Sequence, residues 1–556
     1  MNILSPKDPF YQPTPAEKQE ILFQIAKNEV SMRAIDEEIQ KLIRQRRELE
    51  DQAALYASML APVRRLTFDI LACIFHEFVH ASEGDPWILA HVSRSWRTSA
   101  LSLPALWSGI HVQLDPSVRL SSLQSHRRID GREYCANDHR LDLALRRSST
   151  YPLDVKIASP AALPQVVRAH VTTMLHMVLQ HMHRWRSLEV EGSISRLPGL
   201  PMDPLSRLEH LTLHTRDTSL LSLINNTATG LISFTNTQLG LEHFTPAVWW
   251  STLRSLHLTI PVDMSIPPQT GTLMGLLARA ESLEELSLDY HQMQPVPMHE
   301  SVTLANLKRL ELYDIPHLLP FHCPNLVHLR VSVGKRRPVI TTAPLRTPST
   351  PIHLPHLTHL VFEHPNIAVL SSLVAPSLDE LVISPQVRII APQYNDNAFE
   401  SIWNEERQKR GHVLVPRVLR LEDIHVSANA IKGMLSYLPD LRLLEMKWLR
   451  TDYLEVLSTL VESTTKMTMA ASGGRGPEPV TAGQSAKATL RVPSICPSLK
   501  TLLLHDASTL RSGGDTRGIQ AKLESVVRTR RELGNPLKSA RFRWPQGSEM
   551  EEFIVC

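Results

Sequence analysis

The sequence predicts an α/β protein in which helical N-terminal segments precede a long repeat array with a parallel sheet. Three observations support this prediction. Residues 16–60 contain neither proline nor glycine, apolar residues recur at helical spacing between residues 69 and 100, and one six-residue phrase, L-x-x-L-x-L, recurs from residue 180 onward. The chain has 556 residues, 42% of them hydrophobic and 21% charged, so it can form several domains or one long array.

Composition argues against several classes of protein. The formal net charge of +3 is close to neutral for this length and gives no support for a general nucleic-acid binder. The five cysteines form no C-x-x-C pair, which favours a reducing compartment, the cytoplasm or the nucleus. No basic region with a long apolar core follows the first residue, and no run of about 18 apolar residues occurs, so neither secretion nor a membrane span is expected. We expect residues 1–15 to be disordered.

Residues 16–60 carry the seam of a coiled-coil helix. Two interleaved series, each with a step of seven residues, alternate three and four apart. The first is Ile25, Met32, Ile39, Arg46, Ala53 and Leu60, and the second is Asn28, Ile35, Leu42, Leu49 and Tyr56. The polar residues Asn28 and Arg46 interrupt the seam and can fix its register or the number of partners. The helix can serve self-association or hetero-association, or it can fold back on its own chain.

A second apolar pattern predicts two short helices within residues 61–110. A helix from about Asp69 places apolar residues on one broad face: Ile70, Leu71, Ile74, Phe75, Phe78 and Val79. A second helix is predicted from Leu89, Val92, Trp96 and Ala100, which recur at helical spacing. Two such helices cannot bury this apolar area alone, so they must pack together and against a partner.

The order Pro-x-Arg-Arg-Leu, Ile-Leu-x-x-Ile-Phe and Val-Ser-Arg-x-Trp-Arg-x-x-Ala-Leu-x-x-Pro-x-Leu-Trp resembles an F-box. The resemblance covers residues 15–115 and is to the large F-box families of basidiomycete fungi. It implies that residues 61–110 bind a Skp-type adaptor and, through it, a cullin-RING ubiquitin ligase. Carried over position by position, the adaptor-binding residues are Leu66, Ile70, Leu71, Ile74, Phe75, Val92 and Trp96.

Two positions depart from the F-box pattern. Thr67 replaces the usual proline, and Asp69 replaces the usual glutamate. Thr67 can still cap the helix, and Asp69 still complements the positive end of the helix dipole. The fold should therefore survive both changes, while their effect on adaptor affinity is left open.

The segment His76-Glu77-Phe78-Val79-His80 matches H-E-x-x-H, the helical zinc site of metalloproteases. A hydrolytic zinc site also needs a third protein ligand and an open coordination position. The extended pattern fails, because Glu83 stands in place of its glycine and Pro86 in place of its third histidine. A zinc hydrolase is therefore the minor alternative, and we expect no metal or other cofactor and a solvated helix face at this position.

The phrase L-x-x-L-x-L predicts an irregular leucine-rich-repeat solenoid over residues 181–550. Strong copies begin at residues 185, 208, 253, 283, 307, 326, 357, 378, 441 and 499, and weaker copies at 231, 416 and 537. Each copy is a short strand that can bury its leucines only by stacking on its neighbours. Residues 111–180 form a connector that could hold the first units, because residues 106–112 and 152–157 have strand character. Loops are expected at 334–351 and 466–492.

Side chains between and just after the last two leucines of each copy should face the concave side of the array. We expect a protein target to contact His257, Asp289, Glu311, Tyr313, Arg330, Glu363, Arg420 and Glu445 there. The mixed charge disfavours nucleic acid. The resemblance to an F-box implies the function of a non-enzymatic substrate-recognition subunit of a Skp-cullin-F-box ligase. The alternative is a non-ligase interaction scaffold with a degenerate box.

Overall fold

A computed structural model describes the parts of the chain that carry this architecture. The described residues are 12–60, 62–81, 84–113, 138–158, 173–192, 205–216, 218–240, 243–244, 248–260, 270–290, 302–313, 321–332, 351–363, 367–384, 392–409, 411, 414–422, 424, 426–447, 457, 496, 498–505, 516–532, 536–546 and 549–555. The chain divides into two compact units, residues 1–103 and 104–556. The segment 61–110, expected to form one helical box, therefore extends past this division.

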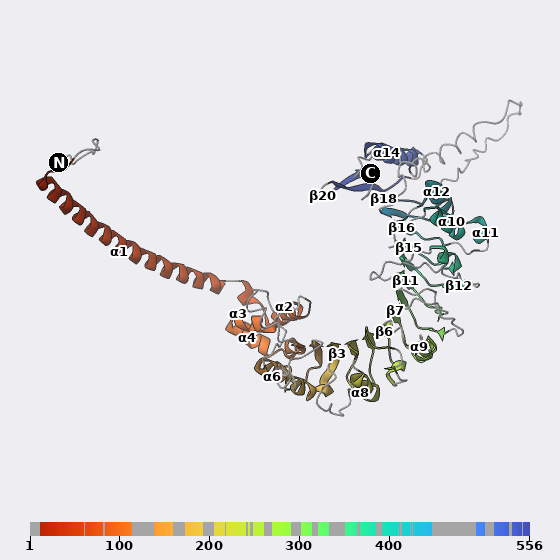
Figure 1. Cartoon of the computed structure of the whole chain (residues 1–556), viewed down its shortest axis with the longest axis horizontal. Helices are drawn as coiled ribbons and strands as arrows, with labels where there is room; N and C mark the ends of the chain where they lie inside the picture. The colour runs from red at the N-terminus through yellow and green to blue at the C-terminus, as the bar shows by residue number, and fades with distance from the viewer. Residues whose placement is uncertain are drawn as a thin grey trace. The chain divides into compact units, whose positions relative to one another are not determined.

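The first unit begins with α1, one uninterrupted helix over Pro15–Leu60 (Figure 1). Thr14 and Glu17 form a capping box at its start: the Thr14 N–H donates to Glu17 Oε2 at 2.8 Å, and the Glu17 N–H donates to Thr14 Oγ1 at 3.4 Å. The helix ends before Pro62, which opens the 3-10 turn η1 (Pro62–Arg65). The prediction of a helix over 16–60 is confirmed.

Three short helices follow: α2 (Phe68–His80), α3 (Pro86–Val92) and α4 (Arg94–Leu101). Leu71, Phe75 and Val79 recur every four residues on α2 and are buried. The Phe75 ring lies 5.0 Å from the Trp96 ring on α4, centroid to centroid. This aromatic contact joins α2 to α4 and forms the centre of the small helical core.

The prediction of one helix across residues 89–100 is wrong. Ser93 has extended backbone angles, φ −158° and ψ 169°, and separates α3 from α4. Its hydroxyl accepts the Trp96 N–H at 3.1 Å, so it caps α4. Asp85 caps α3 in the same way, accepting the Trp87 N–H at 3.0 Å. Thr67 also stands at an N-cap position, but in the described part of the chain its side chain makes no capping hydrogen bond, contrary to expectation.

The second unit is built on a 16-stranded sheet whose strands follow one another in sequence order. All adjacent pairs are parallel except β19 and β20, which are antiparallel. The strands are β1 (Gly109–Gln113), β2 (Leu153–Ala158), β3 (Trp185–Glu191), β4 (His210–His214), β5 (Ser233–Asn236), β6 (Ser255–Ile260), β7 (Glu285–Tyr290), β9 (Arg309–Tyr313), β11 (His328–Ser332), β13 (His359–Glu363), β15 (Glu380–Ile383), β16 (Val418–Glu422), β17 (Leu443–Lys447), β18 (Thr501–His505), β19 (Ser539–Gln546) and β20 (Glu549–Val555). Every one of the thirteen L-x-x-L-x-L copies supplies a strand, and the two earlier segments supply β1 and β2.

One turn geometry recurs before successive strands. The first leucine of a copy donates its N–H to the carbonyl three residues earlier, as Leu307 does to Leu304 and Leu357 to Leu354, both at 3.3 Å. The next residue donates to the matching residue of the preceding unit: Lys308 to the Glu284 carbonyl, at 2.8 Å. Each unit therefore satisfies backbone groups of its neighbour, which explains why the copies stack in order.

Helices and 3-10 turns connect the strands, and Figure 1 shows α8, α9, α10 and α12 on one side of the sheet. The helices are α6 (Asp138–Arg147), α8 (Ser219–Thr227), α9 (Thr270–Leu277), α10 (Pro392–Ile402), α11 (Glu405–Lys409), α12 (Ala428–Ser436) and α14 (Thr516–Glu532). The 3-10 turns are η2 (Pro104–Trp107), η3 (Met182–Arg184), η5 (Val248–Ser251) and η6 (Ile367–Ser372). Two small parallel sheets, β8 (Val302–Thr303) with β10 (Phe321–His322) and β12 (Ile352–His353) with β14 (Leu373–Val374), complete the connections.

The core lies between the sheet and these connections. The second and third leucines of the copies point into it, as Leu286 and Leu288 do on β7. Trp249 and Trp250 stack at 4.6 Å on η5, and Trp249 lies edge-on to the buried Phe234. Residues 1–11, residues 334–350 of the first expected loop and all of the second expected loop, 466–492, lie outside the described residues. None of the described helices combines the length and the apolar character that a membrane span requires.

Candidate interaction surfaces

The short helices α2, α3 and α4, which we call the helical unit, expose two pairs of apolar side chains, which we call the exposed pairs. On α2, Ile70 and Ile74 lie one turn apart and are 48% and 43% exposed. On α3, Ile88 and Val92 lie one turn apart and are each 56% exposed. Large apolar side chains paired in this way on a helix surface are typical of protein contacts. Ile88 was not predicted, because in this part of the sequence the F-box pattern matches Val92 and Trp96 but not Ile88.

The seven residues predicted to bind an adaptor divide by burial. Ile70, Ile74 and Val92 are exposed, and Leu66 and Trp96 are half-buried. Leu71 and Phe75 are 4% and 0% exposed, so they hold the helices together and cannot present a contact surface themselves. The broad apolar face of α2 thus has an inner part, centred on Phe75, and an outer part, centred on Ile74.

The H-E-x-x-H residues lie on the exposed side of α2. His76, Glu77 and His80 are all exposed, and the two imidazole rings lie 4.3 Å apart, centroid to centroid. Within the described residues, no three histidine, cysteine, aspartate or glutamate side chains form a group that could hold a metal ion. The two histidines are thus not joined by a third ligand from that part of the chain.

The sheet has an open face, made by the strand residues that alternate with the buried leucines. All eight residues predicted to face a target lie on strands at these alternating positions: His257, Asp289, Glu311, Tyr313, Arg330, Glu363, Arg420 and Glu445. Seven are half-buried, and Glu445 is 8% exposed. Side chains from neighbouring strands therefore contact one another across this face.

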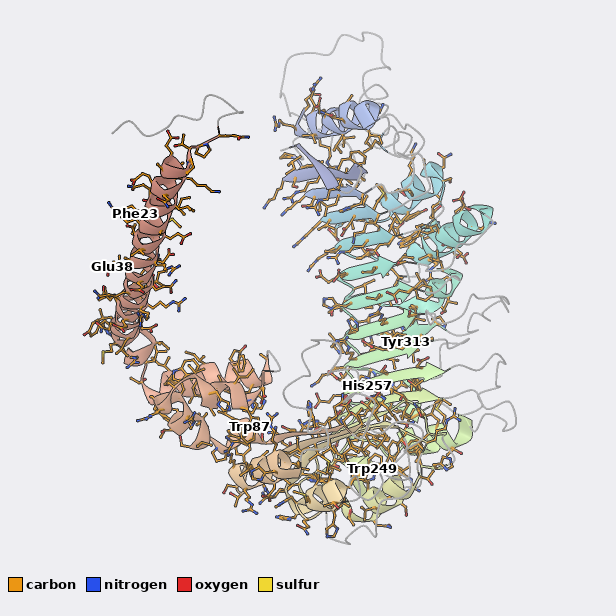
Figure 2. The ribbon with its side chains drawn as sticks, turned by 60° about the vertical axis from the view of Figure 1, so that its left-hand side comes forward. Phe23, Glu38, Trp87, Trp249, His257 and Tyr313 are labelled. Carbon is orange, nitrogen blue, oxygen red and sulfur yellow. The ribbon has the colours of Figure 1, made fainter. Side chains whose placement is uncertain are left out.

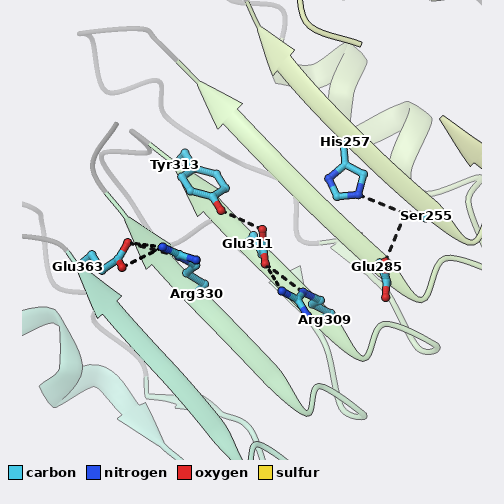
Figure 3. Close-up of polar contacts among 8 residues, drawn as sticks. All are labelled: Ser255, His257, Glu285, Arg309, Glu311, Tyr313, Arg330 and Glu363. Atoms are coloured by element: carbon cyan, nitrogen blue, oxygen red, sulfur yellow. Dashed lines mark hydrogen bonds and ion pairs between the residues drawn. The ribbon is translucent and has the colours of Figure 1, made fainter. Parts of the chain in front are cut away.

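Glu311 on β9 is the centre of a first polar cluster (Figure 3). Arg309 Nη2 donates to Glu311 Oε1 at 2.6 Å, and the Tyr313 hydroxyl donates to Oε2 at 2.9 Å. Burial acts to raise the pKa of Glu311, but the hydrogen bonds from Arg309 and Tyr313 outweigh it and hold the pKa below the ordinary glutamate value. Burial, together with the hydrogen bond to the Glu311 carboxylate, raises the pKa of Tyr313 to about 12.

An ion pair continues the cluster on the next two strands. Arg330 Nη2 on β11 lies 2.9 Å from both carboxylate oxygens of Glu363 on β13. The Arg330 guanidinium also lies 5.9 Å from the Tyr313 ring centre, within the range of a cation–π contact. Burial acts to lower the pKa of Arg330, but the contact with Glu363 more than compensates, so this pKa is raised.

A second polar cluster spans β15 to β18 and is centred on Glu445. Arg420 bridges two strands, with Nη1 3.2 Å from Glu380 Oε1 and Nε 3.2 Å from Glu445 Oε2. Lys447 Nζ lies 3.3 Å from Glu445 Oε1 and 2.8 Å from Glu422 Oε1, and His505 Nε2 lies 3.3 Å from Glu445 Oε1. Burial lowers the pKa of His505, with Lys447 and Arg543 acting in the same direction and Glu445 opposing them.

Two valines separate the clusters. Val361 on β13 stands in register with Arg330 on one side and Val382 on the other, and Val382 stands in register with Arg420. Both valines are half-buried. The open face thus presents a short apolar strip between two arginines whose charges are already paired with carboxylates. Such a surface can recognise a protein by shape and polarity, with acidic and basic groups in fixed positions.

Five residues of these clusters are not among the eight predicted to contact a target: Arg309, Glu380, Glu422, Lys447 and His505. Arg309 and Glu380 precede the second leucine of their copies, a position that also faces outward because strand side chains alternate. His505 follows the last leucine of its copy, where the same rule that selected Tyr313 would have found it.

The chain matches no family model and no curated protein.

Proposed function

We propose that this protein is a substrate-recognition subunit of a Skp-cullin-F-box type ubiquitin ligase. The helical unit would act as an F-box that binds a Skp-type adaptor. The sheet unit would be a leucine-rich-repeat-like solenoid that binds a target protein. The observation that carries the proposal is the presence, in one chain, of a small helical unit with the exposed pairs and a large sheet with a polar open face.

The exposed pairs support the adaptor half of the proposal. Ile70, Ile74, Ile88 and Val92 leave apolar surface in contact with water, and covering it would be favourable by about 25 cal/mol per Å² before association costs. The buried contact of Phe75 with Trp96 gives this surface a rigid support, since the rings lock α2 against α4. A rigid apolar surface loses little entropy on binding.

The open face of the sheet supports the second part of the proposal, the binding of a target protein. Because the parallel strands follow one another in sequence order, each strand adds one row of side chains to the open face. The ion pairs around Glu311 and Glu445 hold their side chains in defined rotamers. The protein would contribute proximity, holding a target near a ubiquitin-charged partner, while other subunits carry out the transfer.

Co-purification of the full-length chain with a Skp-type adaptor tests the proposal. We expect wild type to retain the adaptor and the double variant Ile70→Asp/Ile74→Asp to lose it, because carboxylates would be buried in the apolar interface. His76→Asp is the matched control, since His76 is exposed on the other side of the same helix and should leave binding intact. Binding that resists the double substitution would refute the proposed interface, and a wild-type chain that retains no adaptor would refute the function.

One observation favours a second candidate, a non-ligase scaffold with a degenerate box. The seam of α1 is exposed along its length, from Ile25 at 48% to Leu49 at 64%. A chain that assembles through this helix could gather partners without engaging a ligase. Self-association without adaptor binding would favour the scaffold over the ligase subunit.

A further inference from the structure

The helix α1 exposes an unusual amount of apolar surface. Its 46 residues span about 69 Å, and fourteen large apolar side chains along it are exposed, among them Phe23 (Figure 2). The apolar seam residues from Ile25 to Tyr56 are 46–64% exposed. A surface of this extent along one helix calls for a covering partner.

The polar interruptions of the seam decide which pairing of two copies is acceptable. In a parallel pair, Arg46 would meet Arg46 of the second copy inside the seam, and Asn28 would meet Asn28. Two guanidiniums in one partly dehydrated layer repel each other. Arg46 pairs with Glu50 of its own helix at 2.8 Å, but Glu50 lies beside the seam and cannot separate the two guanidiniums.

Reversing one helix removes this conflict. Residues of the first series then lie opposite residues of the second. A single register brings the two polar positions together, with Arg46 opposite Asn28 of the second copy. The same register pairs Ile25 with Leu49, Met32 with Leu42, Ile39 with Ile35, Ala53 with Ile21, and Lys18 with Tyr56. It also overlaps residues 15–59 of both copies, almost the whole of α1.

We infer that α1 binds α1 of a second copy of this chain in an antiparallel coiled coil with Arg46 opposite Asn28. The Asn28 amide oxygen accepts a hydrogen bond from the guanidinium, and a polar layer of this kind fixes register. Twofold symmetry repeats the pair once on each side of the centre. The other central layers are apolar, so a shift by one heptad would place Arg46 against Ile35 or Ile21 and would be unfavourable.

One feature works against this register. Asp36 and Glu38 flank its centre and meet their own counterparts across the twofold axis. Both side chains are exposed, so water and salt screen this repulsion. The parallel alternative instead brings like charges together at Arg46 within the seam, where screening is weaker. The buried layer therefore determines the orientation.

The antiparallel pairing has a consequence for the rest of the chain. The residues that follow Leu60 leave the coiled coil at opposite ends in the two copies. The two helical units would then be attached about 70 Å apart. The pairing is independent of whether those units bind an adaptor, and its test needs no adaptor.

Disulfide cross-linking of the full-length chain tests orientation directly. Ile25→Cys and Leu49→Cys are placed singly in copies with tags of different size, on a background in which Cys73, Cys135 and Cys556 are serine. We expect a cross-linked species containing both tags when the two variants are mixed, and little cross-linking of either variant alone. Strong cross-linking of each variant to itself would show a parallel pair and overturn the inference. So would a monomer by light scattering with no cross-link in the mixture.

A substitution at Asn28 gives an independent measure. Asn28→Glu would place a carboxylate opposite Arg46 in the antiparallel register, and we expect a dissociation constant about threefold to tenfold lower. The same change in a parallel pair would set two carboxylates against each other and weaken association. Asn28→Gln is the matched neutral control. Sedimentation equilibrium measures all three proteins, and weaker association of Asn28→Glu than of Asn28→Gln would refute the register.

Discussion

Arg330 on β11 and Glu363 on β13 form a diagonal ion pair, with Nη2 2.9 Å from both carboxylate oxygens. The strand register places Arg330 opposite Val361 and Glu363 opposite Ser332, so the two side chains reach across one step of the sheet to meet. Arg330 and Glu363 thus neutralise each other's charge on the open face. At this position a bound protein would meet an ion pair with little net charge to attract it from a distance.

Coupling between Arg330 and Glu363 can be measured with a double-mutant cycle. We expect Arg330→Gln and Glu363→Gln each to lower the melting temperature, because each leaves the other charge half-buried without its partner. The double substitution should cost less than the sum, with a coupling of roughly 0.5–1 kcal/mol. Arg309→Gln with Glu363→Gln serves as the control pair, since no contact joins those two side chains in Figure 3. Strict additivity for the first pair would contradict the observed contact.

The Tyr313 phenol should couple stability to alkaline pH. Its pKa in the folded chain is about 12, above the ordinary value of 10.0. The folded state therefore keeps the phenolic proton longer than the unfolded state, and the stabilisation from this group is complete below pH 10 and is lost as the pH rises toward 12. We expect the melting temperature of Tyr313→Phe to fall less steeply than that of wild type across this range. Parallel curves would show that burial and the Glu311 contact do not raise the pKa of Tyr313.

His505 should couple stability to acid. Burial lowers the pKa of this imidazole below the ordinary value of 6.5, with Lys447 and Arg543 adding to the effect. As the pH falls below 6.5, the unfolded chain gains a proton that the folded chain still resists, so stability decreases. His505→Asn removes this difference. Melting temperatures measured from about pH 7 to about pH 5 should decline less in the variant, and an equal decline would contradict the predicted linkage.

The sheet could be predicted from the sequence because its signal is both local and repeated. Each L-x-x-L-x-L copy, such as the one containing Leu286 and Leu288, marks a strand whose neighbours are the preceding and following copies. The antiparallel strand β20 carries no such phrase and was not predicted. The polar clusters required the register, since contacts such as Arg420 with Glu380 join strands through positions that the sequence alone does not align.

The helical unit was less predictable for two physical reasons. The break at Ser93 depends on a serine that caps α4 in preference to continuing α3, a local competition that apolar spacing does not reveal. The apolar face of α2 covers half of the helix, and spacing does not say which part faces the core. The structure assigns Phe75 to the core and Ile74 to the surface, although the two are neighbours in sequence.

This division of α2 predicts opposite outcomes for adjacent substitutions. Phe75 is fully buried against Trp96, so Phe75→Ala removes a core ring and should cost about 3–5 kcal/mol of stability. Ile74 is 43% exposed, so Ile74→Ala should change stability by less than about 1 kcal/mol. Limited proteolysis of the full-length chain can follow the helical unit, because cleavage between residues 62 and 103 identifies its unfolding. Phe75→Ala should expose the segment 62–103 to cleavage, while Ile74→Ala should remain as resistant as wild type. If Ile74→Ala were the more sensitive variant, the inner and outer parts of α2 would be reversed, and Ile70 and Ile74 could no longer be the surface that meets a partner.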